Sequence, residues 1–296
     1  MLLGGEGNDT LRGDPGADLI NGGAGRDTAS FLTNGSGATA VTVNLALGIT
    51  GGGAAGDTLI GIENVIGSRS GDLLVGDAGV NRLEGDEGDD TLEGGVGADE
   101  LLGGAGRDAV SYAGSAAGVT VNLLRPAANR GDAAGDVFSR IEDVIGSSFD
   151  DVIRGDAAAN LLVGGGGTDR LRGEGGDDTL IGGAGADGLH GGDGADSFRF
   201  GSPSEGRDVI LDFTPGQDRI EVSAATFGLP PGRLYVVAFQ PSVTGSPYGD
   251  HPQFTYETDT GRLRWDADGD GPGKAVLIAT LAGLPMPSYA DFFVVA

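Results

Sequence analysis

The chain has 296 residues, of which 60 are glycine, two are histidine and none is cysteine, and its formal net charge is −26. These numbers exclude disulfides, thiolate metal sites and histidine-rich zinc or iron centres. The negative charge makes nucleic acid and anionic membrane surfaces poor partners and cations good ones. No apolar run approaches the roughly 20 residues of a membrane-spanning helix. The opening MLLGGEGNDT has neither the basic nor the apolar region of a signal peptide, so we expect no cleavable one.

Nine-residue units recur over the first two thirds of the chain. They form three blocks, at residues 4–30, 67–111 and 146–199, which contain three, five and six units. Such a period argues against disorder, although glycine-rich chains are often disordered.

A longer repeat, with an offset of about 79 residues, overlays these units. GGAGRD recurs at Gly22 and Gly103, and GIENVIGS at Gly61 matches RIEDVIGS at Arg140. The segments between the blocks are therefore predicted to be duplicated, more irregular coils. Within them, AAGDTLI and AAGDVFS keep the pattern of an aspartate followed by an apolar residue.

Each unit has glycine mostly at positions one, two and four, aspartate at position six and an apolar residue at position eight. Glycine allows positive φ and therefore sharp turns. The last three residues suffice for a short strand, in which alternation turns position eight inward. Two units then close one coil, and coils stacked at about 4.8 Å give two parallel sheets over a thin core. We predict an all-β fold, a parallel β-roll, over residues 1–200.

Stacked coils bring the position-six aspartates close together. At about 5 Å, like charges repel by about 1 kcal/mol in water and by several near a protein surface. A divalent cation between successive turns removes this repulsion, because carboxylates and glycine carbonyls are the oxygen ligands that calcium prefers. A single aspartate in a turn is usually only a cap, but twelve in register favour a metal-binding role.

The units resemble the GGxGxDxUx nonapeptide of the RTX (repeats-in-toxin, haemolysin-type) calcium-binding proteins. This resemblance implies a β-roll, calcium (Ca2+) as cofactor between the turns, and export by a type I secretion system. It implies carbonyl ligands from turn glycines such as Gly165 and Gly167; Glu174 stands where the pattern has glycine and is left out of that set. By position, it implies carboxylate ligands at Asp9, Asp18, Asp27, Asp72, Asp90, Asp99, Asp108, Asp151, Asp169, Asp178, Asp187 and Asp196.

Four units depart from this pattern. Asn81 and Asn160 replace the aspartate, and GSRSGDLLV and GSSFDDVIR lack turn glycines. A neutral amide is a weaker ligand, so weaker or empty sites are predicted there. If n units hold n − 2 ions, the three blocks together predict about eight calcium ions.

The nonapeptides end near Phe200, and residues 201–296 are predicted to form a C-terminal antiparallel β cap. GRDVILDFTPGQDRIEVS alternates like strands around a Pro-Gly turn. It resembles the segment that closes the roll in serralysin-type proteases. Asp208 and Asp218 are candidates for a last calcium site, whereas Asp212 is expected to cap a turn.

Residues 254–283 predict two or three antiparallel strands with DADGDG in a hairpin loop. Asp266, Asp268 and Asp270 match the start of an EF-hand loop, but Leu277 stands where its bidentate glutamate would be. We expect a hairpin loop, with weak calcium binding as the alternative.

The chain ends in SYADFFVVA. An acidic residue before a terminal apolar run resembles the uncleaved secretion signals of the RTX family, and it is equally consistent with a final strand. The resemblance implies a secreted, extracellular protein with a type I exporter as its partner.

No catalytic motif is found: HExxH and GxSxG are absent, and neither His190 nor His251 has a neighbouring nucleophile. We therefore predict a calcium-binding protein that is not an enzyme. The alternative is a non-catalytic C-terminal module of a larger secreted protease, lipase or alginate epimerase, with an upstream catalytic domain or an extracellular target as its partner. Because the chain starts within the repeats, its origin as a module of a larger protein is slightly favoured.

Overall fold

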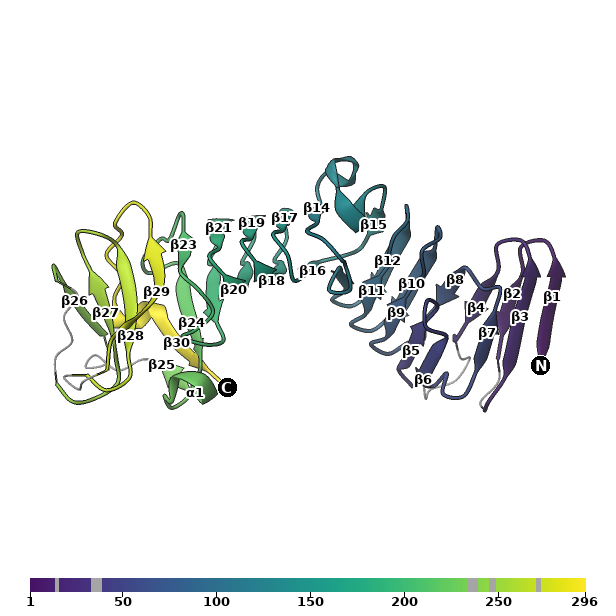
Figure 1. Cartoon of the computed structure of the whole chain (residues 1–296), viewed down its shortest axis with the longest axis horizontal. Coiled ribbons are helices and arrows are strands. Elements are labelled where there is room, and N and C mark those ends of the chain that lie inside the picture. Colours follow the sequence, from purple (N-terminus) through teal and green to yellow (C-terminus); the bar gives the residue numbers. More distant parts are fainter. Residues whose placement is uncertain (14–15, 33–38, 234–238, 245–248, 270–272) are drawn as a thin grey trace. The chain divides into compact units, whose positions relative to one another are not determined.

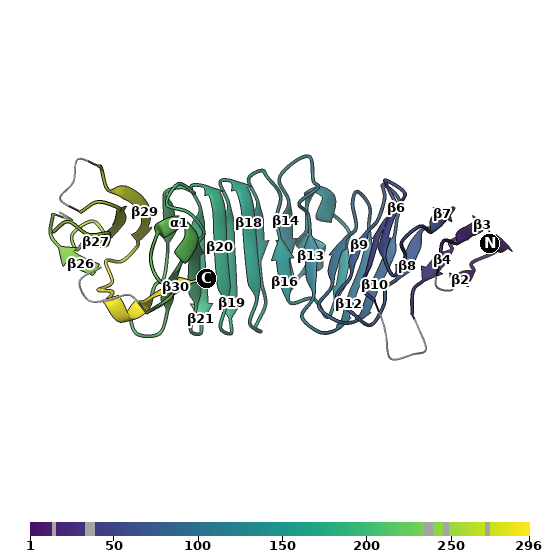
Figure 2. The same ribbon diagram turned by 90° about the horizontal axis from the view of Figure 1, so that it is seen from below.

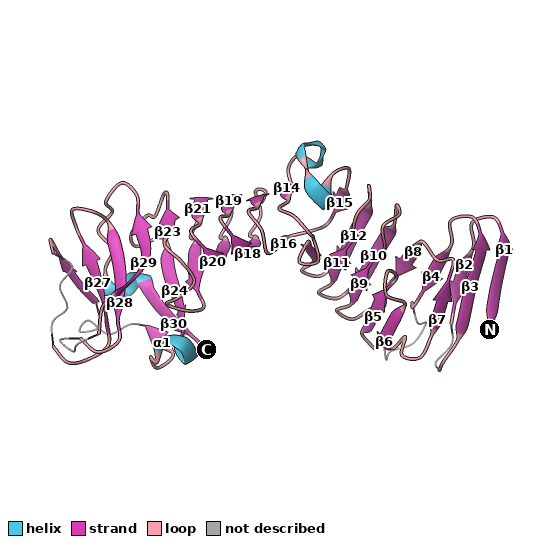
Figure 3. Cartoon of the chain, in the orientation of Figure 1, coloured by secondary structure: helices cyan, strands magenta, loops and turns pink. Residues whose placement is uncertain are grey.

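The computed structural model describes residues 1–13, 16–32, 39–233, 239–244, 249–269 and 273–296. These residues are almost entirely β-structure, as Figures 1 and 3 show. The chain forms two compact units, residues 1–145 and 146–296, each of which is described by itself. The prediction of an all-β parallel roll is confirmed. The predicted division into a roll and a cap at residue 200 stays a prediction.

The first unit contains three sheets, in which most neighbouring strands are parallel. The first is β1 (Leu2–Glu6), β3 (Leu19–Ala24) and β7 (Thr58–Ile60). The second is β2 (Thr10–Arg12), β4 (Thr28–Ser30), β8 (Asn64–Ile66), β10 (Arg82–Glu87), β12 (Glu100–Ala105) and β15 (Val137–Ser139). The third is β6 (Ile49–Gly52), β5 (Val41–Asn44), β9 (Leu73–Val75), β11 (Thr91–Glu93), β13 (Ala109–Ser111) and β16 (Asp143–Ile145).

The two segments between the blocks are less regular. The first contains a hairpin, because β5 and β6 pair antiparallel. The second contains β14 (Thr120–Asn122) and the 3-10 turns η1 (Pro126–Ala128) and η2 (Gly131–Ala133). Both segments return to the roll in parallel register, where β8 joins β4 and β16 joins β13. Both segments are thus irregular, and their origin as a duplication stays a prediction.

The second unit has two sheets. One contains β18 (Leu161–Gly167), β20 (Thr179–Gly185), β22 (Ser197–Phe200), β24 (Arg219–Ser223), β30 (Phe292–Val295) and β25 (Gly232–Arg233). The other contains β17 (Val152–Arg154), β19 (Arg170–Gly175), β21 (Gly188–Asp193), β23 (Asp208–Ile210), β29 (Val276–Leu281), β28 (Arg262–Asp266), β27 (Gln253–Glu257) and β26 (Phe239–Ser242). Short helical segments are α1 (Ala224–Phe227) and η4 (Tyr289–Asp291).

Successive coils are related by a register of eighteen residues, which is two units. Leu83 pairs with Leu101, and Leu162 pairs with Leu180. Figure 2 shows β18 beside β20 and β19 beside β21. The predicted coil of two units is therefore correct.

The apolar residues at position eight form the thin core. Leu92 and Val110 in the first unit and Leu180 and Phe198 in the second are completely buried. Their neighbours at positions seven and nine face outward, because strand residues alternate between the two faces of a sheet. β19 illustrates this alternation, with exposed Arg170 and Arg172 on either side of buried Leu171.

The end of the second unit continues both sheets and adds an aromatic core. β23 and β24 extend the roll in parallel, whereas β27, β28 and β29 are antiparallel, as predicted. β29 and β30 then pair in parallel with β23 and β24. Phe254 contacts Trp265 and Phe292, with ring centroids 4.7 and 5.3 Å apart. The final residues thus form a strand of the fold.

Candidate metal centres

The position-six aspartates form hydrogen-bonded ladders along the stack. The backbone N–H of each donates to Oδ1 of the residue one coil further on; from Asp151 to Asp169 and from Asp169 to Asp187 the distance is 2.8 Å. In the first unit the ladders run through Asp9 and Asp27; Asp18 and Asp57; Asp72, Asp90 and Asp108; and Asn81, Asp99 and Asp136. In the second they run through Asp151, Asp169, Asp187 and Asp208, and through Asn160, Asp178, Asp196 and Asp218.

The second carboxylate oxygen of most predicted ligands has no partner. Within the described residues, nine of the twelve have a buried Oδ2 without a hydrogen bond: Asp9, Asp27, Asp90, Asp99, Asp108, Asp169, Asp178, Asp187 and Asp196. Burying an unpaired charged oxygen is costly unless it is neutralised or bound to a metal. We name these nine atoms the orphaned oxygens. Each needs a proton or a cation to neutralise its charge.

Burial raises the pKa of seven of these carboxylates, and neighbouring acids add to the effect. Burial and then the charges of Asp72 and Asp108 raise the pKa of Asp90 to about 7. Burial and the charge of Asp196 raise the pKa of Asp178 to about 7. The pKa is also raised, with burial as the first cause, at Asp99, Asp108, Asp169, Asp187 and Asp196.

Glycine at position one allows the orphaned oxygens to lie close to its backbone, where a β-carbon would otherwise be. A β-carbon on Gly85 would lie 2.0 Å from Asp90 Oδ2 and 2.7 Å from the carbonyl oxygen of Gly103 in the next coil. A β-carbon on Gly173 would likewise lie 2.0 Å from Asp178 Oδ2. A carboxylate oxygen and a carbonyl oxygen thus converge where a side chain would otherwise be.

Carbonyls at positions two and four also point along the stack. The Gly165 and Gly167 oxygens would lie 2.1 and 1.6 Å from β-carbons on Gly183 and Gly185. Glu174 has the positive φ of a position-two glycine, 82°, and its carbonyl also faces the next coil, at Gly192. The backbone of Glu174 therefore matches that of the turn glycines, although the sequence pattern left Glu174 out of the carbonyl ligands.

The other three predicted ligands have different surroundings. Asp72 Oδ2 accepts from the Ser68 N–H at 2.5 Å, and Asp151 Oδ2 accepts from the Ser147 N–H at 2.5 Å. Asp18 is partly exposed, with Oδ1 at 3.7 Å from the N-terminal amine. Their role as ligands stays a prediction.

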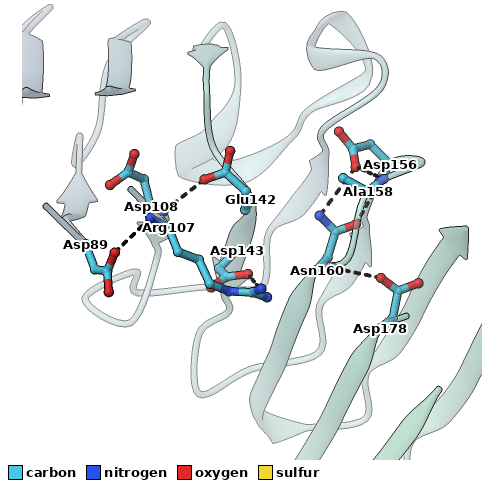
Figure 4. Close-up of polar contacts among 9 residues, drawn as sticks. All are labelled: Asp89, Arg107, Asp108, Glu142, Asp143, Asp156, Ala158, Asn160 and Asp178. Atoms are coloured by element: carbon cyan, nitrogen blue, oxygen red, sulfur yellow. Dashed lines mark hydrogen bonds and ion pairs between the residues drawn. The ribbon is translucent and has the colours of Figure 1, made fainter. Parts of the chain in front are cut away.

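In the two units with asparagine at position six, the side-chain amide forms hydrogen bonds within its own turn. Asn160 Oδ1 accepts from the Asp156 N–H at 2.8 Å, and its Nδ2 donates to Asp156 Oδ1 at 3.4 Å (Figure 4). Asn81 and Asp77 repeat this arrangement, at 2.8 and 3.2 Å. Asn160 still donates its N–H to Asp178, so the ladder is unbroken.

Four ladder residues were absent from the predicted ligand set. Asp57 accepts from the Asp18 N–H and Asp136 accepts from the Asp99 N–H, at 2.8 and 2.9 Å. The sequence pattern that could have identified these two aspartates is the AAGD phrase of the irregular segments. The other two, Glu63 and Glu142, also accept ladder N–H groups. Glutamate in the recurring IEN and IED phrases was their only sequence signal.

Near the end of the roll, Asp208 and Asp218 complete the ladders by accepting from Asp187 and Asp196, both at 3.0 Å. Asp212 accepts from the N–H groups of Gly191 and Gly192 and lies 2.9 Å from His190 Nδ1. Asp212 therefore caps the turn of the neighbouring coil.

In the DADGDG loop, Asp266 Oδ1 accepts from the N–H groups of Asp268 and Gly269. Asp270 lies outside the described residues. The loop joins β28 to β29, as the hairpin prediction required. The second histidine, His251, lies in the segment before β27.

The oxygen ligands at the turns of the roll suit a hard cation. Carboxylate and carbonyl oxygens are the ligands that calcium takes, and the orphaned oxygens lie beside the position-one glycines, where carbonyl oxygens of the next coil also converge. No group of three or more His, Cys, Asp or Glu side chains gathers to hold a metal within the described residues. A calcium site at these turns would therefore combine carboxylates with backbone carbonyls.

A family model, the RTX calcium-binding nonapeptide repeat, matches the chain at residues 1–29, 75–110, 138–171 and 163–198. The chain therefore contains RTX calcium-binding nonapeptide repeats over these residues, and such repeats bind calcium. A comparison with curated proteins finds no match.

Two solved structures are similar to part of the chain. The AlgE6R3 subunit of the Azotobacter vinelandii mannuronan C5-epimerase is 34% identical, with a TM-score of 0.35, covering 50% of this chain and 80% of that one. The AlgE6R2 subunit of the same enzyme is 31% identical, with a TM-score of 0.34, covering 52% and 91%. Where the structure describes the chain, none of its helices has the length and apolarity to cross a membrane.

Proposed function

We propose that this chain binds one calcium ion at each orphaned oxygen, about nine in all, and that this binding drives folding of the roll. The nine buried carboxylate oxygens without hydrogen-bond partners support this proposal. The proposed ligands are these carboxylates together with turn carbonyls such as those of Gly165 and Gly167.

The folding step follows from the charge. At neutral pH the ionised aspartates repel along each ladder, and their buried oxygens have lost the water that would solvate them. Calcium supplies positive charge and replaces that water, so the roll is stable only when the ion is bound. The free energy of binding then contributes directly to folding.

Calcium titration tests this proposal. In excess chelator we expect mostly coil by circular dichroism, and in millimolar calcium a β spectrum, with about nine ions per chain by elemental analysis. Magnesium should substitute poorly, since it requires octahedral geometry and retains its waters. A cooperative β-rich fold in chelator, or only one or two ions per chain, would contradict the proposal.

The second half of the proposal concerns export. An unfolded acidic chain can pass through a secretion channel, and extracellular calcium can then fold the repeats on the outside. We assign the export signal for a type I exporter to the terminal residues 291–296, and the location to the extracellular space. What supports this assignment is the acidic and apolar tail and the calcium dependence of the repeats.

Substitutions in the tail can separate its role in export from its role in folding. Phe292 and Val294 are buried in β30, whereas Phe293 and Val295 are half-buried. Replacing Phe293 and Val295 by serine should reduce secretion in a host with a matching type I exporter and leave calcium-induced folding intact. Unchanged secretion would remove the assignment. Lost secretion together with lost folding would make the tail a structural strand only.

The same calcium chemistry would serve a non-catalytic module of a larger secreted enzyme, such as a protease, lipase or alginate epimerase. The complete open reading frame separates these alternatives, since a catalytic domain in the same frame would favour the module.

A further inference from the structure

The two irregular segments of the first unit rejoin the roll in the same way. Glu63 directly precedes β8, whose Asn64 pairs with Thr28, and Glu142 directly precedes β16, whose Asp143 pairs with Ala109. In a regular coil, the residue before this strand is the position-six aspartate. The two glutamates therefore occupy the aspartate position in the ladder.

The turn that leads to each glutamate is shorter than in a nonapeptide. Gly103 precedes Asp108 by five residues, whereas Arg140 precedes Glu142 by two. Glutamate has one more methylene than aspartate, which extends its carboxylate to the ladder from this shorter turn. Glu142 Oε2 accepts from the Asp108 N–H at 2.9 Å (Figure 4), a distance like those in regular coils.

The aspartate that faces each glutamate keeps an orphaned oxygen. Asp108 has no exposed surface, and its Oδ2 has no partner. A β-carbon on Gly103 would lie 2.4 Å from this oxygen and 2.1 Å from the carbonyl oxygen of Arg140. The junction therefore has the same convergence of carboxylate and carbonyl oxygens as a regular coil.

The other junction repeats this geometry with different neighbours. Glu63 Oε2 accepts from the Asp27 N–H at 2.8 Å, and Asp27 is fully buried with an orphaned Oδ2. A β-carbon on Gly22 would lie 2.4 Å from that oxygen and 2.1 Å from the carbonyl oxygen of Gly61. Two junctions with one arrangement argue against an accident of local packing.

Each returning strand is also held by an arginine from the coil before it. The Arg107 guanidinium pairs with both oxygens of Asp143, at 2.7 and 2.8 Å (Figure 4). At the first junction, Arg26 Nη2 donates to Asn64 Oδ1 at 3.2 Å. These contacts fix the residue after each glutamate and hence the position of the glutamate itself.

We propose that each junction is a calcium site outside the nonapeptide pattern, in which a glutamate replaces an aspartate. One site would use Asp108, Glu142 and the Arg140 carbonyl, and the other Asp27, Glu63 and the Gly61 carbonyl. Calcium then fixes the point where each irregular segment returns to the roll. This inference rests on the proposed function and assigns two of its nine ions.

Counting bound calcium in variants of the whole chain tests the junction sites. Glu142→Gln and Glu63→Gln keep an oxygen that can accept the ladder N–H but remove the charge. Each should lose one ion, from about nine to about eight, and the double variant two. Amide hydrogen exchange at Glu142 and Asp143, which donate to the Asp108 carbonyl at 3.0 and 2.9 Å, should become faster in Glu142→Gln.

Glu100→Gln is the matched control, since Glu100 is an exposed glutamate paired with Arg82 and lies outside the ladders. It should keep the full number of ions. Adding Glu142→Gln to Asp108→Asn should remove no further ion, because the two residues share one site.

The outcomes separate this inference from the proposed function. Wild-type protein without bound calcium overturns the proposed function. Wild-type protein with about nine ions and glutamine variants that keep them all overturns only the junction sites. If Glu142→Gln fails to fold in saturating calcium, Glu63→Gln and Glu142→Asp carry the test, and a full number of ions in both overturns the inference.

Discussion

Two consecutive coils of the second unit, residues 146–163 and 164–181, have the same register but satisfy their turns differently. In the first coil, Ser147 donates to Asp151, and the amide of Asn160 bonds to its own turn. In the second, the orphaned oxygens of Asp169 and Asp178 have no donor. The first unit repeats this order, with coil 67–84 satisfied by Ser68 and Asn81 before coil 85–102 with its orphaned oxygens.

This difference shows that a single coil can satisfy its turns by hydrogen bonds without a cation. What requires one is a buried carboxylate that the chain leaves without a donor. Each of the two larger blocks thus begins with one coil whose turns are satisfied by hydrogen bonds, followed by coils with orphaned oxygens, which we propose to depend on calcium. Substitutions that convert one kind of coil toward the other test this distinction.

The largest effect is expected when the space beside an orphaned oxygen is filled. A β-carbon on Gly173 would lie 2.0 Å from Asp178 Oδ2 and 2.5 Å from the Gly191 carbonyl. Gly173→Ala should remove calcium at this coil and, through overpacking, lower the free energy of unfolding by about 1–3 kcal/mol or more. Urea unfolding in saturating calcium and an ion count measure both effects.

Gly166→Ala is the control in the neighbouring turn. Its β-carbon would meet no atom nearer than 3.5 Å, and its φ lies outside the left-handed region. Stability should change by less than about 1 kcal/mol. Equal losses in the two variants would show that glycine is needed for the turn as a whole and not for a metal cradle.

Exchanging acid and amide between the two coils should have the next largest effect. Asp178→Asn keeps the ladder acceptor but replaces the orphaned oxygen with a donor, so it should lose one ion and fold more readily in chelator. Asn160→Asp removes the donor to Asp156 and adds a charge, so it should disfavour folding by about 1–3 kcal/mol and raise the calcium concentration at which the chain folds. Calcium titrations followed by circular dichroism distinguish the two variants.

The combined variant is the sharpest form of this experiment. Asp178→Asn with Asn160→Asp leaves the composition unchanged and moves the carboxylate by one coil. If the comparison is correct, calcium dependence moves with it. A double variant that binds and folds like the wild type would mean that the identity of the position-six residue does not decide where calcium binds.

Much of this fold could be predicted from the sequence, because its determinants are local and repeated. Glycine, aspartate and leucine at a nine-residue period fixed the coil, the eighteen-residue register and the buried position eight. The pairing of β29 and β30 with β23 and β24 could not be predicted. It joins residues about 70 positions apart, and no local pattern in these strands identifies their partners.

The site was less predictable where side chains change their role. Loss of glycine at Ser68 and Ser147 predicted only a weaker site, although serine supplies the donors that satisfy the aspartate. Glu142 was missed because its turn is shortened and its ladder partner, Asp108, lies 34 residues earlier. A nine-residue period detects neither of these arrangements.

A smaller effect is expected from pH, since protons can neutralise the orphaned carboxylates. Burial raises the pKa of Asp169 and Asp178 from about 4 in the unfolded chain to about 7. Protonation of these two carboxyl groups therefore makes its full contribution to stability below about pH 4. This contribution is lost as the pH rises through about 7. In chelator, β-structure by circular dichroism should increase from pH 7.5 to pH 5.

Calcium competes with these protons, so its apparent affinity should rise from pH 5 to pH 7.5 and binding should release protons. Asp178→Asn should reduce the number of protons released, which calorimetry in buffers of different ionisation enthalpy measures. A calcium affinity independent of pH over this range would contradict proton competition at these carboxylates.

The smallest effect is expected from Ser147→Ala, which tests the satisfied coil itself. The Ser147 hydroxyl donates to Asp151 Oδ1 and accepts from the Phe149 N–H, at 2.9 and 3.1 Å, while the Ser147 N–H donates to Asp151 Oδ2. Alanine removes these hydroxyl bonds and the longer one to the Phe149 carbonyl at 3.4 Å but keeps the backbone bond to Asp151, so the loss should be about 0.5–1.5 kcal/mol. Because this coil is satisfied by hydrogen bonds, the ion count should not change, and exposed Ser148→Ala should have almost no effect. Loss of an ion in Ser147→Ala would instead place calcium at Asp151, and the distinction between the two coils would then be one of affinity.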